Sequence, residues 1–380
     1  MPIITHIDDF RQPARRKIPR MFYDLVDAGS YSESTYRANE ADLRAITLRQ
    51  KVCVDVAERT TATTLLGQPV SLPVVLAPVG SCGTIHADGE ILAARAAESC
   101  GALFTLSTMG ICSIEDVAAA VTRPFWFQLY MMKDRGFVRS LIERAKAANC
   151  STLVVTVDLP IIGQRHKDYK NGMVGRPGLL KRLGILADYA SKPGWCLNMA
   201  RTPRKTFRNV MGHVPGIDTL DKFKIWSASQ FDPAVSWQDI EWLRGLWDGP
   251  LVLKGILTPE DARTACGLGA DGIVVSNHGG RQLDGAPSTI NALPAIAAAV
   301  GDDLEILMDG GIRRGQDIFR ALALGARGVL VGRGFLYGLA AAGQQGVERS
   351  LEILRGELDV TLAMTGCTAI SQVSAECLVR

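Results

Sequence analysis

A histidine and an arginine lie three residues apart in the glycine-rich segment Ser276–Asp284. His278 can exchange a proton near neutral pH, whereas Arg281 stays charged and can hold a carboxylate or phosphate through two parallel hydrogen bonds. The apolar run Asp271–Val275 before the segment is typical of a buried strand. In isolation we would interpret the segment as a turn whose histidine binds the backbone. Together with the features below, it predicts a base and an anion-binding group.

The elements that must position these side chains are short apolar runs, each followed by a helix-like segment, from Leu72 onward. The predicted strands are 73–77, 102–106, 125–130, 152–157, 251–254, 272–276, 305–308 and 328–331. The predicted helices are 88–99, 114–121, 135–148, 237–246, 259–268, 290–300, 316–324 and 346–364. Strands alternating with helices in this number predict an α/β fold, a closed (β/α)8 TIM barrel, in preference to a doubly wound open sheet.

Residues 1–70 precede this alternation and form an N-terminal helical extension, with a short helix predicted to begin at Met21 and to include Val26. The extension does not have the character of a separate folding unit. We therefore predict one domain, 1–380, because barrels of this kind often reach this length with insertions.

Residues 159–235 interrupt the alternation as a long insertion after the fourth strand. The insertion contains the apolar and basic run Leu179–Leu186, Trp195, and further cations at 201, 204, 205 and 208. Such a composition suits contact with an anionic membrane surface. It suits a helical lid over the barrel equally well.

Composition restricts the class of partner and the compartment. The 380 residues are 47% hydrophobic and 21% charged with a net charge of +3, which is typical of a soluble globular protein and too small a charge to indicate nucleic acid. Nine cysteines without a Cys-x-x-Cys pair indicate reduced thiols. No secretory leader or membrane span is expected, so we predict a cytoplasmic protein.

Polar side chains follow the predicted strands one after another. In barrels of this kind the chemistry lies at the carboxyl ends of the strands, so these side chains are expected to meet. The polar side chains are Ser107, Gln128, Tyr130, Thr156, Asp158, Lys254, Ser276, His278, Asp309 and Arg333, and the strand ends also present Pro78, Val79, Gly80, Gly311 and Gly332.

The last two strand ends predict a phosphate site. The loops after the seventh and eighth strands of such barrels commonly hold a phosphate, and here they read Asp309–Arg313 and Gly332–Gly334. Glycines let the backbone approach the phosphate, and Arg313 and Arg333 neutralise its charge. A phosphorylated substrate would fit as well as a cofactor. Lys254 favours a flavin, because a fixed cation at the barrel centre stabilises the charge of a reduced ring.

Four stretches of this sequence resemble the motifs of the FMN-dependent L-2-hydroxy acid dehydrogenases and oxidases. They are Ser-Asn-His-Gly-Gly-Arg-Gln-Leu-Asp at 276–284, Trp-Phe-Gln-Leu-Tyr at 126–130, Thr-Val-Asp at 156–158 and Asp-Gly-Gly-Ile-Arg at 309–313. The resemblance extends from Pro19 to the C-terminal helix. Within the family the sequence is most similar to the respiratory L-lactate dehydrogenases, at 77–80, 104–108 and 335–337.

The resemblance implies a role for each matching residue. His278 would be the base, with Asp158 fixing its ring, and Arg281 and Arg165 would bind the substrate carboxylate. Tyr130 would contact the substrate hydroxyl or the developing carbonyl oxygen. FMN would be held at its ring by Pro78, Val79, Gly80, Ser107, Gln128, Thr156 and Lys254, at its ribityl chain by Ser276 and Asp309, and at its phosphate by Gly311, Arg313, Gly332 and Arg333. No metal site is expected.

Two positions bear on the substrate and on the electron acceptor. Leu25 stands where relatives usually have a tyrosine that binds the substrate carboxylate. Gly80 is typical of the membrane-linked dehydrogenases of the family, whereas oxidases often have alanine. Gly80 and the basic insertion therefore favour quinone or another respiratory acceptor.

The expected reaction is oxidation of an L-2-hydroxy acid, L-lactate to pyruvate. By family resemblance the protein is expected to be a homo-oligomer, a tetramer. The basic insertion predicts peripheral attachment to the cytoplasmic face of the inner membrane. The alternatives are a peroxide-forming oxidase, a dehydrogenase of larger acids such as mandelate, and a flavin-binding protein of low turnover. The residues leave open whether His278 takes the C2 proton or the hydroxyl proton.

Overall fold

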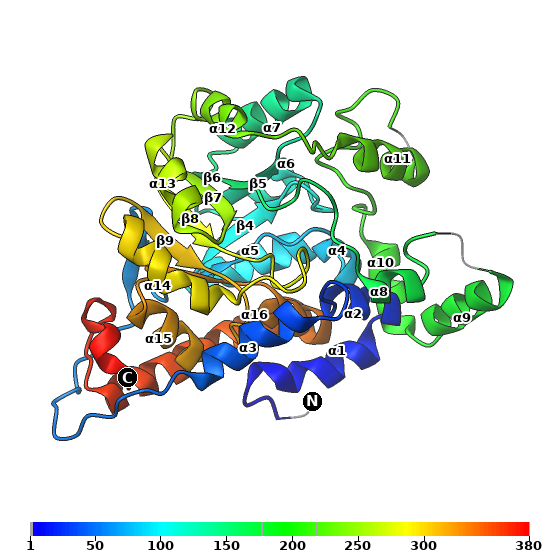
Figure 1. Ribbon diagram of the computed structural model, residues 1–380. Helices are drawn as coiled ribbons and strands as arrows, with labels where there is room; N and C mark the ends of the chain where they lie inside the picture. Colours follow the sequence, from blue (N-terminus) through cyan, green and yellow to red (C-terminus); the bar gives the residue numbers. More distant parts are fainter. Residues whose placement is uncertain (1–2, 176–177, 218, 380) are drawn as a thin grey trace.

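Eight parallel strands form a closed barrel at the centre of the computed structural model, which describes residues 3–175, 178–217 and 219–379 (Figure 1). The strand order is β10-β3-β4-β5-β6-β7-β8-β9. Their bounds are β3 Val74–Leu76, β4 Leu103–Ser107, β5 Trp126–Tyr130, β6 Thr152–Thr156, β7 Leu251–Ile256, β8 Gly272–Val275, β9 Glu305–Met308 and β10 Gly328–Val331. All eight predicted strands and the predicted TIM barrel are confirmed.

The strands read as nearly continuous apolar runs because both of their faces are buried. Side chains that point into the barrel form a compact inner cluster that includes Val75, Trp126, Val154 and Leu307. Alternate residues point outward and pack under the surrounding helices. The polar residues at the strand ends are therefore held on a rigid base.

Helices cover the outside of the barrel, and each barrel strand is followed along the chain by at least one of them (Figure 1). They are α4 Cys82–Ile85, α5 Gly89–Ser99, α6 Ile114–Ala118, α7 Arg135–Ala147, α12 Trp237–Arg244, α13 Pro259–Gly267, α14 Thr289–Val300, α15 Gly315–Ala323 and α16 Arg333–Thr365. Helix α13 begins as its sequence indicates, since the Thr258 side chain accepts from the Asp261 N–H at 3.2 Å. Helix α16 starts earlier than predicted and is broken at Ala342 and Gly343.

A short hairpin that the sequence reading missed closes the amino-terminal end of the barrel. Its strands are β1 Thr63–Leu65 and β2 Gln68–Val70. Leu65 packs into the inner barrel cluster, and the Leu66 N–H donates to the Glu305 side chain at 2.8 Å. Glu305 is the first residue of β9, so the hairpin lies opposite the carboxyl ends of the strands.

The N-terminal extension consists of the 3-10 helix η1 Ile7–Phe10 and helices α1 Arg11–Lys17, α2 Arg20–Val26 and α3 Ser34–Ala45. The predicted short helix is α2. Asp284 accepts from the N–H groups of Ser32 and Thr35 at 2.8 and 3.1 Å, at the start of α3. The last residue of the histidine motif thus holds the extension against the carboxyl end of the barrel.

The insertion follows β6, the fourth barrel strand, as predicted, and contains α8 His166–Lys170, α9 Leu179–Ala190, α10 Pro193–Arg201 and α11 Leu220–Gln230. Helices α9 and α11 lie at the periphery of the molecule (Figure 1). On α9 the side chains of Leu179, Leu180, Leu183 and Leu186 are 72%, 85%, 54% and 62% exposed. Within the described residues, the helices are too short or too polar to cross a bilayer.

Candidate active site

A cavity of about 300 Å³ opens at the carboxyl ends of the barrel strands. Residues from the barrel, the N-terminal extension and the insertion all contribute to its wall. Among the predicted site residues, those that line it are Pro78, Val79, Gly80, Tyr130, Arg165, Lys254, His278, Arg281, Asp309, Gly311, Arg313, Gly332 and Arg333. The structure thus brings together most of the side chains that the sequence placed at the strand ends.

His278 lies three residues after the end of β8 and has a left-handed backbone conformation, with φ of 57°. Its N–H donates to the Ser276 hydroxyl at 3.0 Å, and its Nδ1 lies 3.0 Å from Asp158 Oδ1. A proton on Nδ1 that is donated to this carboxylate leaves Nε2 as the ring atom that accepts a proton. The pair is therefore arranged as a base with a fixed tautomer.

Asp158 reaches the histidine because β7 leaves room for it. Gly255 lies at a register shift in β7, and a Cβ there would come within 2.6 Å of the Asp158 Cβ. Burial raises the pKa of Asp158, but the charge and hydrogen bond of His278 and the charge of Lys254 outweigh it, so the pKa lies below its ordinary value. Asp158 is ionised at neutral pH and stabilises a protonated imidazole.

Two arginines present positive charge to the same cavity. Arg281 donates from Nη1 to the carbonyl oxygens of Leu25 and Ala28, at 2.8 and 3.0 Å. Arg165 donates to Asp168 at 2.6 Å. Burial, and then the charges of Arg165 and Arg333, lower the pKa of Arg281. A carboxylate in the cavity would relieve this unfavourable burial of like charges.

Tyr130 and a set of apolar side chains complete the substrate side of the cavity. Burial, and then the charge of Asp158, raise the pKa of Tyr130, so its phenol stays protonated and can donate a hydrogen bond. The apolar lining includes Leu25, Met109, Leu159, Ile162 and Phe231. The last three belong to the insertion, from which the sequence analysis had placed only Arg165 in the site, because apolar residues there carry no distinguishing pattern.

Four of the residues predicted to hold FMN are buried just outside the cavity lining, where they bind one another or their neighbours. Gln128 accepts from the Ser107 hydroxyl at 2.9 Å and donates to the Thr156 hydroxyl at 3.0 Å. Ser276 accepts from Lys254 Nζ at 2.8 Å. Ser276 thereby holds Lys254, which lines the cavity, and Ser107, Gln128 and Thr156 hold one another behind the lining.

The surroundings of Lys254 and Asp309 indicate whether the ring and the ribityl chain of FMN fit this cavity. Lys254 Nζ lies 2.7 Å from Asp309 Oδ2, and both side chains are buried. Asp309 Oδ1 is buried and, within the described residues, has no hydrogen-bond partner. An unsatisfied carboxylate oxygen facing a cavity is well suited to accept from a hydroxyl group of a bound ribityl chain.

The two predicted phosphate loops differ in backbone shape, and the loop after β9 needs glycine. Gly311 has φ of +85°, and a Cβ there would lie 2.4 Å from the Asn39 carbonyl oxygen. A Cβ on Gly332 would lie 3.8 Å from Ala77, so the backbone at Gly332 is open to a ligand. Arg313 is buried, its Nη2 lies 3.1 Å from Glu40 Oε1, and its Nε is unpartnered within the described residues. These features fit a phosphate, which accepts hydrogen bonds and balances a buried cation.

Arg333 binds the protein backbone as well as lining the cavity, whereas the sequence analysis assigned it to the phosphate alone. Its guanidinium donates to the carbonyl oxygens of Val26, Gly279 and Ala28 at 2.9, 2.9 and 2.7 Å. The same group lies 4.3 Å from the centre of the Tyr36 ring. Arg333 therefore lines the cavity while it holds the N-terminal extension to the barrel.

The fold and the cavity together define a class, a TIM-barrel oxidoreductase suited to a phosphate-bearing cofactor and an anionic substrate. The FMN-dependent dehydrogenase family matches residues 14–380, and the chain belongs to this family. FMN is accordingly its cofactor.

The relatives cover the whole chain. It is 48% identical to an L-lactate dehydrogenase of Actinobacillus pleuropneumoniae serotype 5b (strain L20) over 378 residues, 99% of this chain and 98% of the relative. It is 47% identical to an L-lactate dehydrogenase of Pseudomonas syringae pv. syringae (strain B728a) over 379 residues, 100% of this chain and 99% of the relative. Among solved structures, the monotopic membrane protein (S)-mandelate dehydrogenase has a TM-score of 0.94 at 35% identity, covering 99% of both chains. Mandelate oxidase has a TM-score of 0.83 at 36% identity, covering 99% and 98%.

Proposed function

We propose that this protein oxidises L-lactate to pyruvate with FMN and passes the electrons to a quinone or a similar respiratory acceptor. The observation that carries the proposal is the His278–Asp158 pair in one cavity with the buried cation of Arg281. A base beside a carboxylate-binding cation is the arrangement that oxidation of a 2-hydroxy acid requires. The L-lactate dehydrogenases at 47% and 48% identity support the choice of substrate.

The residues divide the work between binding and proton transfer. Arg281 and Arg165 bind the substrate carboxylate, and Tyr130 donates to the substrate oxygen. His278 accepts a proton at Nε2 as the hydroxy acid is oxidised, and Asp158 stabilises the resulting imidazolium. FMN, when bound, would supply the acceptor for the two electrons and the second proton.

Anaerobic reduction tests this assignment. The purified protein should be yellow, and L-lactate added without oxygen should bleach its visible absorbance. Mandelate in the same assay tests the larger apolar space beside Leu25, and rapid peroxide formation in air would indicate an oxidase. In His278→Gln we expect FMN to be retained and bleaching to slow by about 10²- to 10⁴-fold. Near-normal bleaching by that variant would refute the proposed base.

We also propose that α9 contacts the cytoplasmic face of a membrane. Its four exposed leucines lie beside Lys181 and Arg182, an arrangement that suits an anionic bilayer surface. The likeness to a solved monotopic membrane protein supports this reading over that of a lid packed on the barrel. Deleting residues 175–208 should move the protein from the membrane to the soluble fraction, whereas unchanged fractionation would favour the lid. The homo-oligomer implied by the family stays a prediction.

A further inference from the structure

We propose that Lys167, in the insertion, is a positioning residue for the two arginines that bind the substrate carboxylate. The proposal rests on the function proposed above, because that function makes Arg165 and Arg281 carboxylate ligands. Lys167 does not belong to the residues that line the cavity. Its effect on the substrate must therefore pass through other groups, and the structure supplies two such connections.

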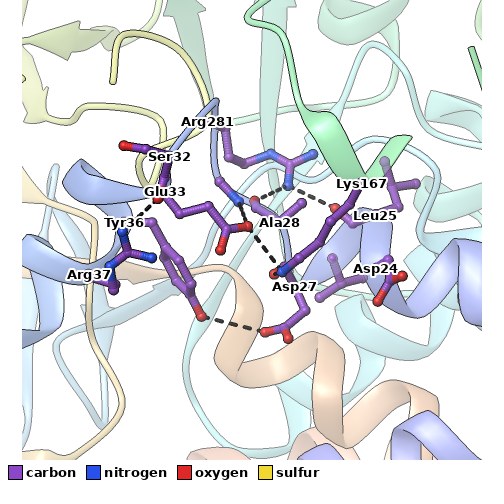
Figure 2. A network of polar contacts seen from close by, with 12 residues as sticks. Asp24, Leu25, Asp27, Ala28, Ser32, Glu33, Tyr36, Arg37, Lys167 and Arg281 are labelled. Carbon is purple, nitrogen blue, oxygen red and sulfur yellow. Dashed lines mark hydrogen bonds and ion pairs between the residues drawn. The ribbon is translucent and has the colours of Figure 1, made fainter. Parts of the chain in front are cut away.

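The first connection runs through the last turn of α2, which contains Leu25, and the following turn Asp27–Glu33, which joins α2 to α3 and is called the α2–α3 turn below. Figure 2 shows Arg281 directed at this part of the chain, where its Nη1 donates to Leu25 and Ala28 oxygens at 2.8 and 3.0 Å. The Ser30 N–H donates to the Gly280 oxygen at 2.9 Å. The guanidinium of Arg281 is therefore oriented by backbone carbonyls, and its position follows the position of the turn.

Lys167 binds the same turn from the side of the insertion (Figure 2). Its Nζ donates to the Asp27 carbonyl oxygen at 2.8 Å and lies 3.0 Å from Glu33 Oε1. That Glu33 oxygen also accepts from the Gly29 N–H at 3.1 Å. One ammonium group thus bonds to both ends of the turn that holds Arg281.

The second connection is the short helix α8 that carries Lys167. Arg165 lies two residues before Lys167 and lines the cavity, where it pairs with Asp168 of the same helix. Asn171, the residue that follows α8, contacts α2, since its side chain donates to Asp24 at 2.7 Å. Lys167 therefore joins the element that carries Arg165 to the turn that orients Arg281, and so fixes the spacing of the two arginines.

Loss of this contact should weaken substrate binding without stopping the reaction. The Lys167 and Glu33 side chains are 36% and 21% exposed, so a fold held by many other contacts should survive their separation. A carboxylate is held equally in the ground state and the transition state, so misplaced arginines raise KM and leave kcat nearly constant. For Lys167→Met we expect a rise in KM of about five- to tenfold and a change in kcat within about twofold.

The test compares FMN-loaded wild type with Lys167→Met, Lys167→Arg and Lys170→Met. The last variant removes an exposed lysine from the same helix and serves as the matched control. KM and kcat are measured with L-lactate. Oxalate, a dicarboxylate that probes the carboxylate site without being oxidised, is titrated, and its Kd is taken from the change in flavin absorbance. The affinity for FMN is measured by fluorescence. Lys167→Met should raise KM and the oxalate Kd by the same factor with unchanged FMN affinity. Lys167→Arg should restore most of the loss, and Lys170→Met should match wild type.

A double-mutant cycle with Glu33→Gln sharpens the result. The Glu33→Gln variant should raise KM and the oxalate Kd by less than Lys167→Met does, and the double variant should show less than the sum of the two effects, because both changes remove the Lys167–Glu33 ion pair. Unchanged KM and oxalate Kd in Lys167→Met would overturn the proposal, and so would a parallel fall in kcat and FMN affinity. Wild type that binds oxalate but is not reduced by L-lactate would refute the proposed substrate alone, whereas wild type that binds no oxalate would refute the carboxylate site and this proposal with it.

Discussion

Arg281 and Arg333 donate to the same atom, the carbonyl oxygen of Ala28, at 3.0 and 2.7 Å. Two buried guanidinium groups therefore lie close together, and the charge of Arg333 contributes to the lowered pKa of Arg281. A substrate carboxylate and a cofactor phosphate would each offset part of this repulsion. The α2–α3 turn thus connects the cofactor side of the cavity with the substrate side.

Arg333→Lys should weaken FMN binding although the charge is conserved. A lysine ammonium cannot make the planar set of bonds to Val26, Gly279 and Ala28, nor stack on Tyr36 as a guanidinium does. We expect the FMN Kd, measured by fluorescence on the apoprotein, to rise about tenfold. Arg349→Lys, at a partly exposed ion pair, is the control. Equal FMN affinity in the two variants would contradict a cofactor-side role for Arg333.

Asp158→Asn should slow flavin reduction by about 10²-fold or more, because an amide neither fixes the His278 tautomer nor stabilises its cation.

Asp158→Asn should also change how the free energy of unfolding depends on pH. The pKa of Asp158 is lower in the folded state, so its ionised form stabilises the fold above the unfolded-state pKa. That contribution is lost as the pH falls through the folded-state pKa. The difference in unfolding free energy between wild type and Asp158→Asn should therefore be larger at about pH 7 than at about pH 3.

Gly311→Ala should destabilise the protein and weaken FMN binding together. Its φ of +85° and the 2.4 Å approach of a Cβ to the Asn39 oxygen require the loop before Arg313 to move. We expect a loss of about 1–3 kcal/mol in the free energy of unfolding. Gly356→Ala is the matched control, since that glycine lies within α16 with open space around it, and a gain of up to about 1 kcal/mol is expected there. The same loss in both variants would show that the loop geometry is not the cause.

Leu25→Tyr should improve the binding of small hydroxy acids. Leu25 lines the cavity and its carbonyl oxygen holds Arg281, so a tyrosine there would place a donor near the carboxylate site. We expect KM for L-lactate to fall about five- to tenfold, while acids with bulky side chains lose affinity because space is filled. Steady-state kinetics with lactate and mandelate measures both effects. A variant with unchanged preference between the two acids would show that Leu25 does not govern the substrate pocket.

The barrel and most of the site could be predicted because both have direct sequence signals. Buried parallel strands such as Leu251–Ile256 read as apolar runs, and polar residues directly after them must meet at one end of the barrel. His278, Asp158 and Lys254 were placed in this way, and the cavity contains two of them with Asp158 bonded to the histidine.

What the sequence did not reveal depends on backbone atoms and on packing between distant segments. The acceptors of Arg281 and Arg333 are carbonyl oxygens at Leu25, Val26, Ala28 and Gly279, which any residue type supplies. For the same reason Arg333 was assigned to the phosphate alone. The apolar wall contributed by Leu159, Ile162 and Phe231 was also missed, since only the folded insertion brings these residues to the cavity.

The β1–β2 hairpin has a consequence for the order of events in turnover. Leu65 fills the amino-terminal end of the barrel, so substrate and product enter and leave the cavity at the opposite end, beside the insertion. The hydroxy acid and the electron acceptor that reoxidises the protein would then use the same opening of the cavity. Pyruvate would have to depart before that acceptor enters, and initial-rate plots against both reactants should give the parallel lines of a ping-pong scheme.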